Sequence, residues 1–162
     1  MSGVSLPMAA ANFDVKRPLG QAFAEICFMI PSKETAVALA VEMVRRAMEM
    51  LTIDDDWMCR AELCLQEALL NAHFHGNHGD PGRTIRVGCF LWAEKVELHV
   101  EDEGTGYALN RDFSKTDTNS PRGRGLFIIR RLMDSVTTNG TGSQIVMSLV
   151  KESGYGNRYY AG

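Results

Sequence analysis

The chain has 162 residues, of which 45% are hydrophobic and 23% are charged, and its formal net charge is −3. This length fits a single domain with a sizeable core, and an ordinary composition without a long basic run does not favour nucleic acid as a partner. No apolar run approaches the roughly 20 residues of a membrane span, and the N-terminus lacks a secretory signal pattern, so we expect a cytoplasmic protein that is not bound to membranes.

The first elements expected in chain order are an N-terminal arm, a strand and a helix. Residues 1–20 have weak periodicity and two prolines, and we interpret them as a flexible arm. Residues 21–30 (QAFAEICFMI) suit a strand. A helix then runs to about Leu51, with Ser32 as its expected N-cap and with apolar residues at helical spacing along one face.

The second predicted helix begins in the acidic run 54–56 and continues to about His75. On a helical wheel at about 100° per residue, it has a broad core face and a second apolar stripe made of Leu63, Leu70 and Phe74. Glu67 and Asn71 lie between these two apolar faces, whereas an ordinary solvated stripe is made of Glu62, Gln66 and His73. A polar line between apolar walls is typical of a pocket lining; the alternative is that Glu67 and Asn71 simply point to solvent.

The rest of the chain predicts strands that come in hairpins. Residues 84–93 and 95–102 read as two strands joined by a tight turn, and a last hairpin has its turn at 139–142. Between the hairpins lie a polar loop of about twenty residues, a length that is usually functional or disordered, and an amphipathic helix over 126–136. Residues 152–162 are expected to form a mobile tail.

The predicted element order, β-α-α-β-β-loop-α-β-β, favours the α+β class. We expect a two-layer α/β sandwich with a mixed, mostly antiparallel sheet and helices on one face, formed by a single domain over residues 21–151. Because the strands occur as hairpins, the helices need not cross between parallel strands, and this argues against a Rossmann-type sheet.

Two glycine motifs stand next to predicted elements. The stretch DEGTGY begins at Asp102, directly after a strand, and Gly104 and Gly106 permit tight turning and close approach of the backbone to a ligand. Gly123 and Gly125 open the third helix, where free N–H groups make an anion cradle. Each motif alone is weak, because a plain turn or a flexible hinge has the same pattern.

The three features in this order resemble the histidine-kinase-like ATPase superfamily, which has the Bergerat ATP-binding fold. Glu-x-x-x-Asn on a helix, Asp-x-Gly-x-Gly after a strand and Gly-x-Gly before a helix look like its N box and two glycine boxes. The short loop between the glycine boxes and the segment GRGLFIIRRLMDSV look most like the anti-sigma-factor serine kinases. The resemblance covers about residues 21–151.

The resemblance implies a role for each motif. Asn71 would hold Mg²⁺ against ATP, and Glu67 would act as the general base on the serine hydroxyl of a partner protein. Asp102 would accept a hydrogen bond from the adenine amino group. Arg124, or alternatively Arg122, would counter the charge that develops on the transferred phosphoryl group. The phosphates would lie against Gly123, Arg124, Gly125 and Leu126.

The resemblance also implies secondary roles. Gly104 and Gly106 would let the adenine ring approach, and Ser143 would place a hydroxyl near the adenine aspartate. His75 would lie toward the phosphates or act as a helix-end histidine near the C-terminal dipole. The loop 107–122 would be mobile without nucleotide and would become ordered around the phosphates.

The implied function is that of an ATP-dependent serine protein kinase and anti-sigma factor. It would phosphorylate an anti-anti-sigma protein, sequester a sigma factor and form a homodimer. One alternative is a non-catalytic ATP-binding partner-switch module, against which the carboxylate at Glu67 speaks. Another is a detached histidine-kinase catalytic domain, although the chain lacks a helix pair carrying a phospho-accepting histidine.

Overall fold

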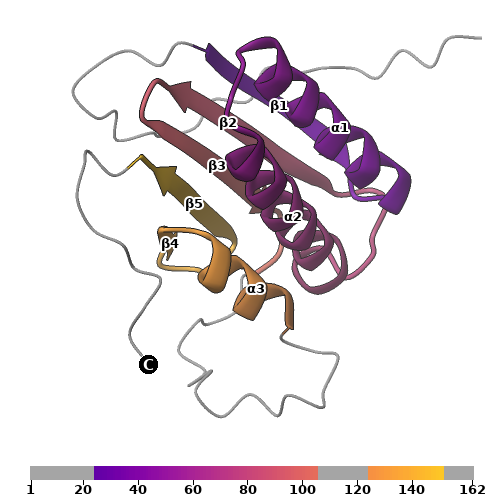
Figure 1. The fold of residues 1–162 in the computed structure, drawn as a ribbon. Helices are drawn as coiled ribbons and strands as arrows, with labels where there is room; N and C mark the ends of the chain where they lie inside the picture. Colours follow the sequence, from indigo (N-terminus) through magenta and orange to yellow (C-terminus); the bar gives the residue numbers. More distant parts are fainter. Residues whose placement is uncertain (1–23, 106–123, 152–162) are drawn as a thin grey trace, which may run out of the picture.

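The computed structural model describes residues 24–105 and 124–151, so the predicted arm, the loop 107–122 and the tail lie outside the described residues (Figure 1). None of the described helices is long and apolar enough to span a membrane. The described elements, in chain order, are β1 (Ala24–Pro31), α1 (Glu34–Met50), α2 (Asp55–Asn71), the π-helical turn η1 (Ala72–Gly76), β2 (Thr84–Trp92), β3 (Lys95–Asp102), α3 (Arg124–Leu132), β4 (Ser135–Thr138) and β5 (Gln144–Val150).

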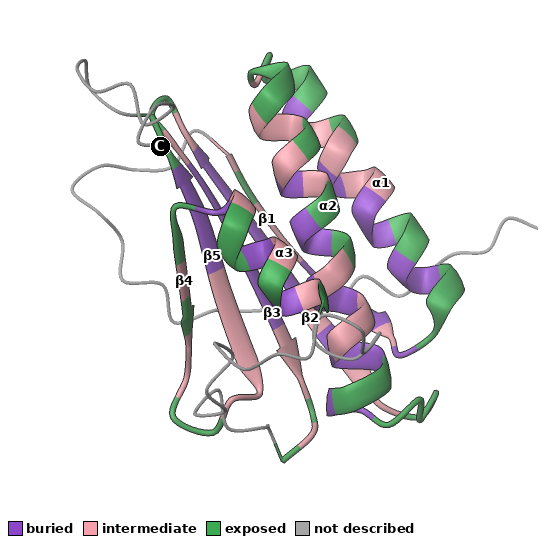
Figure 2. Cartoon of the chain, turned by 60° about the horizontal axis from the view of Figure 1, so that its bottom comes forward, coloured by how far each residue is buried: buried purple, intermediate pink, exposed green. Residues whose placement is uncertain are grey.

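The described strands form one five-stranded sheet in the order β1-β2-β3-β5-β4, and every neighbouring pair is antiparallel. The helices cover one face of this sheet, which gives two layers (Figures 1 and 2). The predicted α+β sandwich is therefore confirmed, and its sheet is wholly antiparallel among the described strands. In the predicted β2–β3 hairpin, Trp92 pairs with Lys95 across a two-residue turn.

The core lies between the helix layer and the sheet, where buried residues face one another (Figure 2). The apolar spacing of α1 is confirmed, because Val37, Ala40, Val41, Val44 and Met48 are buried. Fully burying one such large side chain contributes about 1.5–3 kcal/mol. The largest fully buried side chains include Phe28, Met48, Leu65, Leu69, Ile85, Leu91, Leu98, Ile129, Met147 and Leu149.

The beginning of α1 differs from its prediction. Lys33 occupies the N-cap position, and its side chain makes no capping hydrogen bond. The Ser32 hydroxyl instead lies 2.9 Å from Nδ1 of His73 in a buried contact. The prediction of Ser32 as the cap is wrong because a distant partner on η1 engages this hydroxyl.

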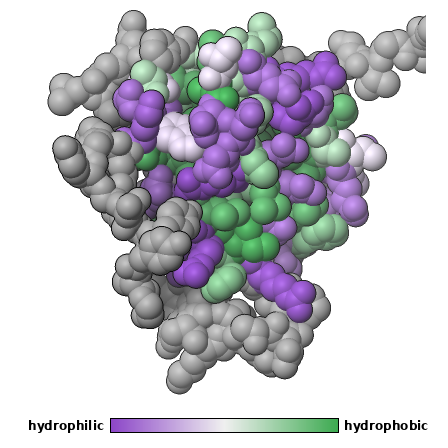
Figure 3. Space-filling view, viewed as in Figure 1, coloured by the Kyte–Doolittle hydropathy of each residue, from purple (hydrophilic) through white to green (hydrophobic). Residues whose placement is uncertain are grey.

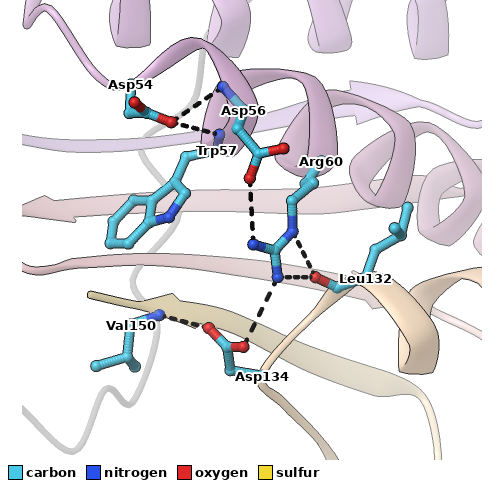
Figure 4. Close-up of polar contacts among 7 residues, drawn as sticks. All are labelled: Asp54, Asp56, Trp57, Arg60, Leu132, Asp134 and Val150. Carbon is cyan, nitrogen blue, oxygen red and sulfur yellow. Dashed lines mark hydrogen bonds and ion pairs between the residues drawn. The ribbon is translucent and has the colours of Figure 1, made fainter. Parts of the chain in front are cut away.

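The second helix begins as predicted but ends differently. Asp54 accepts hydrogen bonds from the backbone N–H groups of Asp56 and Trp57 at 3.0 and 3.3 Å (Figure 4). After α2 the chain forms η1, in which the N–H of Asn77 donates to the carbonyl of Ala72, five residues earlier, at 2.7 Å. This wider turn departs from the geometry of the helical wheel.

The end of α3 also differs from its prediction. The helix ends at Leu132, and Ser135–Thr138 form strand β4 instead of a further helical turn. Residues 135–138 pair with β5, and the two β-branched residues that follow Val136 suit a strand better than a helix.

Arg60 on α2 fixes the C-terminal end of α3 (Figure 4). Its guanidinium donates to the carbonyl of Leu132 through Nε at 2.8 Å and through an Nη atom as well, and it lies 3.7 Å from Asp134 Oδ1. Asp134 in turn accepts from the backbone N–H of Val150 at 2.8 Å. Because a cation at a helix C-terminus stabilises the last carbonyls, this contact holds the C-terminal end of α3 against α2.

Candidate functional site

A pocket opens where α2 and α3 meet strands β3 and β5. It brings together four predicted site residues that are far apart in the sequence: Asn71, Asp102, Leu126 and Ser143. Its other walls are mainly small or apolar, as is usual for a small-molecule site with a few polar groups that fix orientation. These walls are Ala68, Ala72, Val100, Thr138, Gly142 and Ile145.

Asp102 is the acidic group of this pocket, and it lies at the end of β3. Its own N–H donates to the carbonyl of Ser143 at 3.0 Å, and the N–H of Gly104 donates to its Oδ1 at 2.8 Å. Burial raises the pKa of Asp102 above its ordinary value, while the hydrogen bond from Gly104 opposes this effect. Since a carboxylate accepts several hydrogen bonds, Asp102 keeps acceptor capacity for a donor group on a ligand.

The backbone around Asp102 has room only for glycine. A Cβ atom at Gly76 would lie 2.2 Å from Asp102 Cγ, and one at Gly104 would lie 2.1 Å from the carbonyl oxygen of Gly76. Neither distance is compatible with a side chain. That Gly104 lets a ligand approach the backbone stays a prediction; the close approach that the structure shows at Gly104 is to the carbonyl of Gly76 on η1. The sequence did not single out Gly76, because a glycine at a helix end is ordinary.

Glu67 and Asn71 meet the first turn of α3. A Cβ atom at Gly125 would lie 2.5 Å from Glu67 Oε2 and 3.2 Å from Asn71 Nδ2. Both side chains belong to half-buried residues, so the alternative that they simply project into solvent is not what the structure shows. A carboxylate and an amide thus lie one helical turn apart, against a helix start whose N–H groups favour anions.

The second apolar stripe of α2 does not wall this pocket. Leu63 and Phe74 are 40% and 48% exposed, and the α2 side of the pocket is formed by Ala68 and Asn71. His73, which the wheel places in the solvated stripe, is buried. The error at His73 follows from the π turn, because the helical wheel assumes an α-helix throughout.

Asn77 is a residue of the site region that sequence reasoning missed. It is fully buried; its Nδ2 donates to the carbonyl of Thr84 at 2.9 Å, and its Oδ1 accepts from the N–H of Glu103 at 3.0 Å. It therefore joins η1 to the start of β2 and to the chain just after Asp102. No periodic signal marks it, since its partners are distant in sequence.

The remaining predicted site residues are placed as follows. Arg124 is the exposed first residue of α3, and His75 is exposed on η1 and does not line the pocket. The Ser143 hydroxyl lies within hydrogen-bonding distance of two turn side chains, 3.2 Å from Asn139 Nδ2 and 3.0 Å from Thr141 Oγ1. Three predicted residues lie outside the described residues: Gly106, Arg122 and Gly123.

Known proteins were compared with this chain by sequence and by structure. The sequence model described as a histidine kinase-like ATPase domain matches residues 30–149, and the chain belongs to this family. An anti-sigma F factor from Oceanobacillus iheyensis is 27% identical over 127 residues, which cover 75% of this chain and 82% of that protein. The serine-protein kinase RsbW of the same organism is 28% identical over 97 residues, which cover 54% of this chain and 61% of that protein.

Among solved structures, a histidine kinase domain from the blue-light activated histidine kinase of Erythrobacter litoralis EL346 has a TM-score of 0.46 and 17% identity. That match covers 75% of this chain and 61% of that chain, which is less than two thirds of its length. The family match and the two relatives confirm the resemblance to the anti-sigma-factor kinases of this superfamily that the three sequence motifs predicted.

Proposed function

We propose that the protein is an ATP-dependent serine kinase that phosphorylates an anti-anti-sigma protein and also sequesters a sigma factor. The observation that carries this proposal is the meeting of Glu67 and Asn71 at Gly125. It places a proton acceptor and a neutral oxygen ligand beside a helix start suited to anions. The names of the two relatives, an anti-sigma factor and a serine-protein kinase, support the choice of partners.

The residues present fit ATP with Mg²⁺. The described residues contain no cluster of three or more His, Cys, Asp or Glu side chains able to hold a metal, so a cation here would take most of its ligands from phosphate and water. Mg²⁺ is commonly bound in this way, with one or two protein oxygens. Asn71 would supply the amide oxygen, Asp102 would accept from the adenine amino group, and the first turn of α3 would hold the phosphates.

Bound ATP would supply the γ-phosphoryl group, whose bond to the β-phosphate would break so that ADP leaves, and the protein would supply the proton acceptor and the positive charge. Glu67 takes the proton of the acceptor serine hydroxyl as that oxygen becomes the nucleophile. Arg124, at the exposed start of α3, stabilises the negative charge that spreads over the transferred group. Asn71 would hold the metal through its amide oxygen and would take no part in proton transfer.

This division of roles predicts that two neighbouring substitutions have different effects. Glu67→Ala should leave nucleotide affinity nearly unchanged while transfer to the acceptor serine falls by roughly 10²–10⁴-fold, the usual contribution of a general base. Asn71→Ala should weaken Mg²⁺-dependent nucleotide binding and transfer together. Titration calorimetry with and without Mg²⁺ measures nucleotide binding. Transfer of labelled phosphate to the anti-anti-sigma proteins of the organism that encodes this chain measures the kinase activity.

Glu62→Ala is the matched control, because Glu62 is a half-buried glutamate on the same helix. If Glu67→Ala transferred phosphate to the acceptor at the wild-type rate, Glu67 would not be the base, and a non-catalytic binding module would be favoured. Equal effects of the Glu67 and Asn71 variants on both readouts would show that the roles are divided wrongly. Failure of the wild-type protein to phosphorylate any of these acceptors would overturn the kinase proposal itself.

A further inference from the structure

An apolar ridge runs along the outer side of α2 and η1, beside Glu67. Leu63 is 40% exposed, Phe74 is 48% exposed and Leu70 is half-buried. Leu63 and Leu70 follow the i, i+7 spacing of one face of α2, with Glu67 at the i+4 position between them, and Phe74 follows on η1. Figure 3 shows a hydrophobic area in the region of α2 and α3, with hydrophilic residues around it. We call Leu63, Leu70 and Phe74 the α2 ridge.

The neighbouring face of α3 is basic. Arg124, Ile128 and Arg131 follow the i, i+4, i+7 spacing of one face, and both arginines are exposed while Ile128 is half-buried. The helix Arg124–Leu132 carries three arginines and no acidic residue, although the whole chain has a net charge of −3. α3 itself thus carries a net positive charge, and its first turn lies against Glu67.

We propose that the α2 ridge and the Arg124–Arg131 face of α3 form the docking surface for the acceptor protein, and that this protein presents an apolar side chain and carboxylates next to its serine. The proposal rests on the proposed kinase function and adds where, and by what chemistry, the acceptor is recognised. Exposed apolar residues that surround a functional group mark an interaction site more often than scattered ones do.

Two observations favour the acceptor protein as the partner that binds this surface. Glu67 lies within the ridge, so a serine hydroxyl that reaches its carboxylate brings the surrounding protein over Leu63 and Leu70. The charge of α3 then favours an acidic surface and disfavours a basic one, because complementary charge steers encounter and suppresses wrong partners. Apolar contacts would supply the affinity, and the arginines would supply orientation.

The test measures acceptor KM and nucleotide affinity separately. The double variant Leu63→Ala/Phe74→Ala should raise the KM for the unphosphorylated anti-anti-sigma protein about tenfold or more, as expected for removal of interface anchors. Arg131→Gln should raise it about threefold and should flatten its dependence on salt, because one screened attraction is lost. Nucleotide affinity should stay within about twofold in both variants, since none of these side chains lines the pocket.

Leu39→Ala is the matched control, because Leu39 is 50% exposed on α1; it should leave the KM unchanged. An unchanged KM in both ridge and arginine variants, with wild-type transfer intact, would overturn this inference and leave the kinase proposal standing. Conversion of a dimer to a monomer by the ridge variant, with unchanged KM, would show that a second copy covers the surface and would also overturn it. Absence of transfer by the wild-type protein would overturn the kinase proposal, and this inference with it.

Discussion

At Asp102, stability and ligand recognition make opposite demands on one carboxylate. Burial raises its pKa, and the hydrogen bond from Gly104 only partly opposes this. The raised pKa means that the folded protein disfavours the ionised form relative to the unfolded chain. The charged carboxylate, however, is the form that accepts a hydrogen bond most strongly from a ligand N–H.

Asp102→Asn is therefore expected to be more stable than wild type at pH 7 and to bind adenine nucleotides more weakly. The destabilisation by ionised Asp102 is complete above its raised folded pKa and disappears as the pH falls toward the ordinary value of 3.8. The stability advantage of the variant should shrink between pH 7 and pH 4, as measured by urea unfolding. Glu94→Gln, in an exposed hairpin turn, is the control; equal stabilities of Asp102→Asn and wild type at pH 7 would contradict the prediction.

At the scale of elements, the site depends on the side-chain hydrogen bonds that hold η1 against the sheet. Asn77 makes two of these hydrogen bonds: it donates to the carbonyl of Thr84 at the start of β2 and accepts from the N–H of Glu103 after β3. Ser32 and His73 add a second buried contact between the β1–α1 connection and η1. The π turn therefore has a defined place, and Asp102 packs against Gly76 within it.

Asn77→Ala should lower the free energy of unfolding by about 1–3 kcal/mol, because it removes two hydrogen bonds to the partly buried carbonyl of Thr84 and N–H of Glu103. It should also weaken nucleotide binding, although Asn77 does not line the pocket. Denaturant unfolding and calorimetry measure the two effects. Gln66→Ala, on the exposed side of α2, should change neither, and wild-type nucleotide affinity in a destabilised Asn77→Ala would rule out a positioning role.

Elements with strong local signals were predictable from the sequence, and those set by distant contacts were not. The apolar spacing of α1, the start of α2 in the acidic run 54–56 and the two hairpins are local, and the structure confirms them. The motifs also singled out Asn71, Asp102 and Ser143, and these three residues line one pocket in the structure. The Arg60 contact to α3, the burial of Asn77 and the end of α3 depend on residues far along the chain, which no local pattern reports.

At the scale of the molecule, the pocket is assembled from both halves of the chain. α2 and η1 come from the first half, whereas β3, the start of α3 and the turn before β5 come from the second. Neither half of the chain contains both Asn71 and Asp102. Asn71 lies on a helix and Asp102 lies in the sheet, so the site exists only when the helix layer is packed on the sheet. A ligand bound there would contact both halves and would stabilise the folded chain as a whole.

We also propose a homodimer, as the resemblance to anti-sigma-factor kinases implies. Light scattering coupled to gel filtration should give about twice the chain mass of 17.9 kDa at micromolar concentration. Dilution should shift the particle toward the monomer, since association depends on concentration. A particle of 17.9 kDa at every concentration would contradict this prediction and would require sigma-factor sequestration by a single chain.

The crowding of Gly76 against Asp102 also constrains how this chain can change by mutation. While the aspartate is present, a Cβ at position 76 would lie 2.2 Å from its Cγ, so alanine is excluded there. Truncation of Asp102 to alanine would remove the three atoms nearest to that Cβ, so we expect alanine at position 76 to be better tolerated in that background. Once alanine is fixed there, the aspartate can no longer return, because its carboxylate would collide with the new side chain. The order of substitutions at this pair therefore matters, because the aspartate can return until position 76 has also changed and not afterwards.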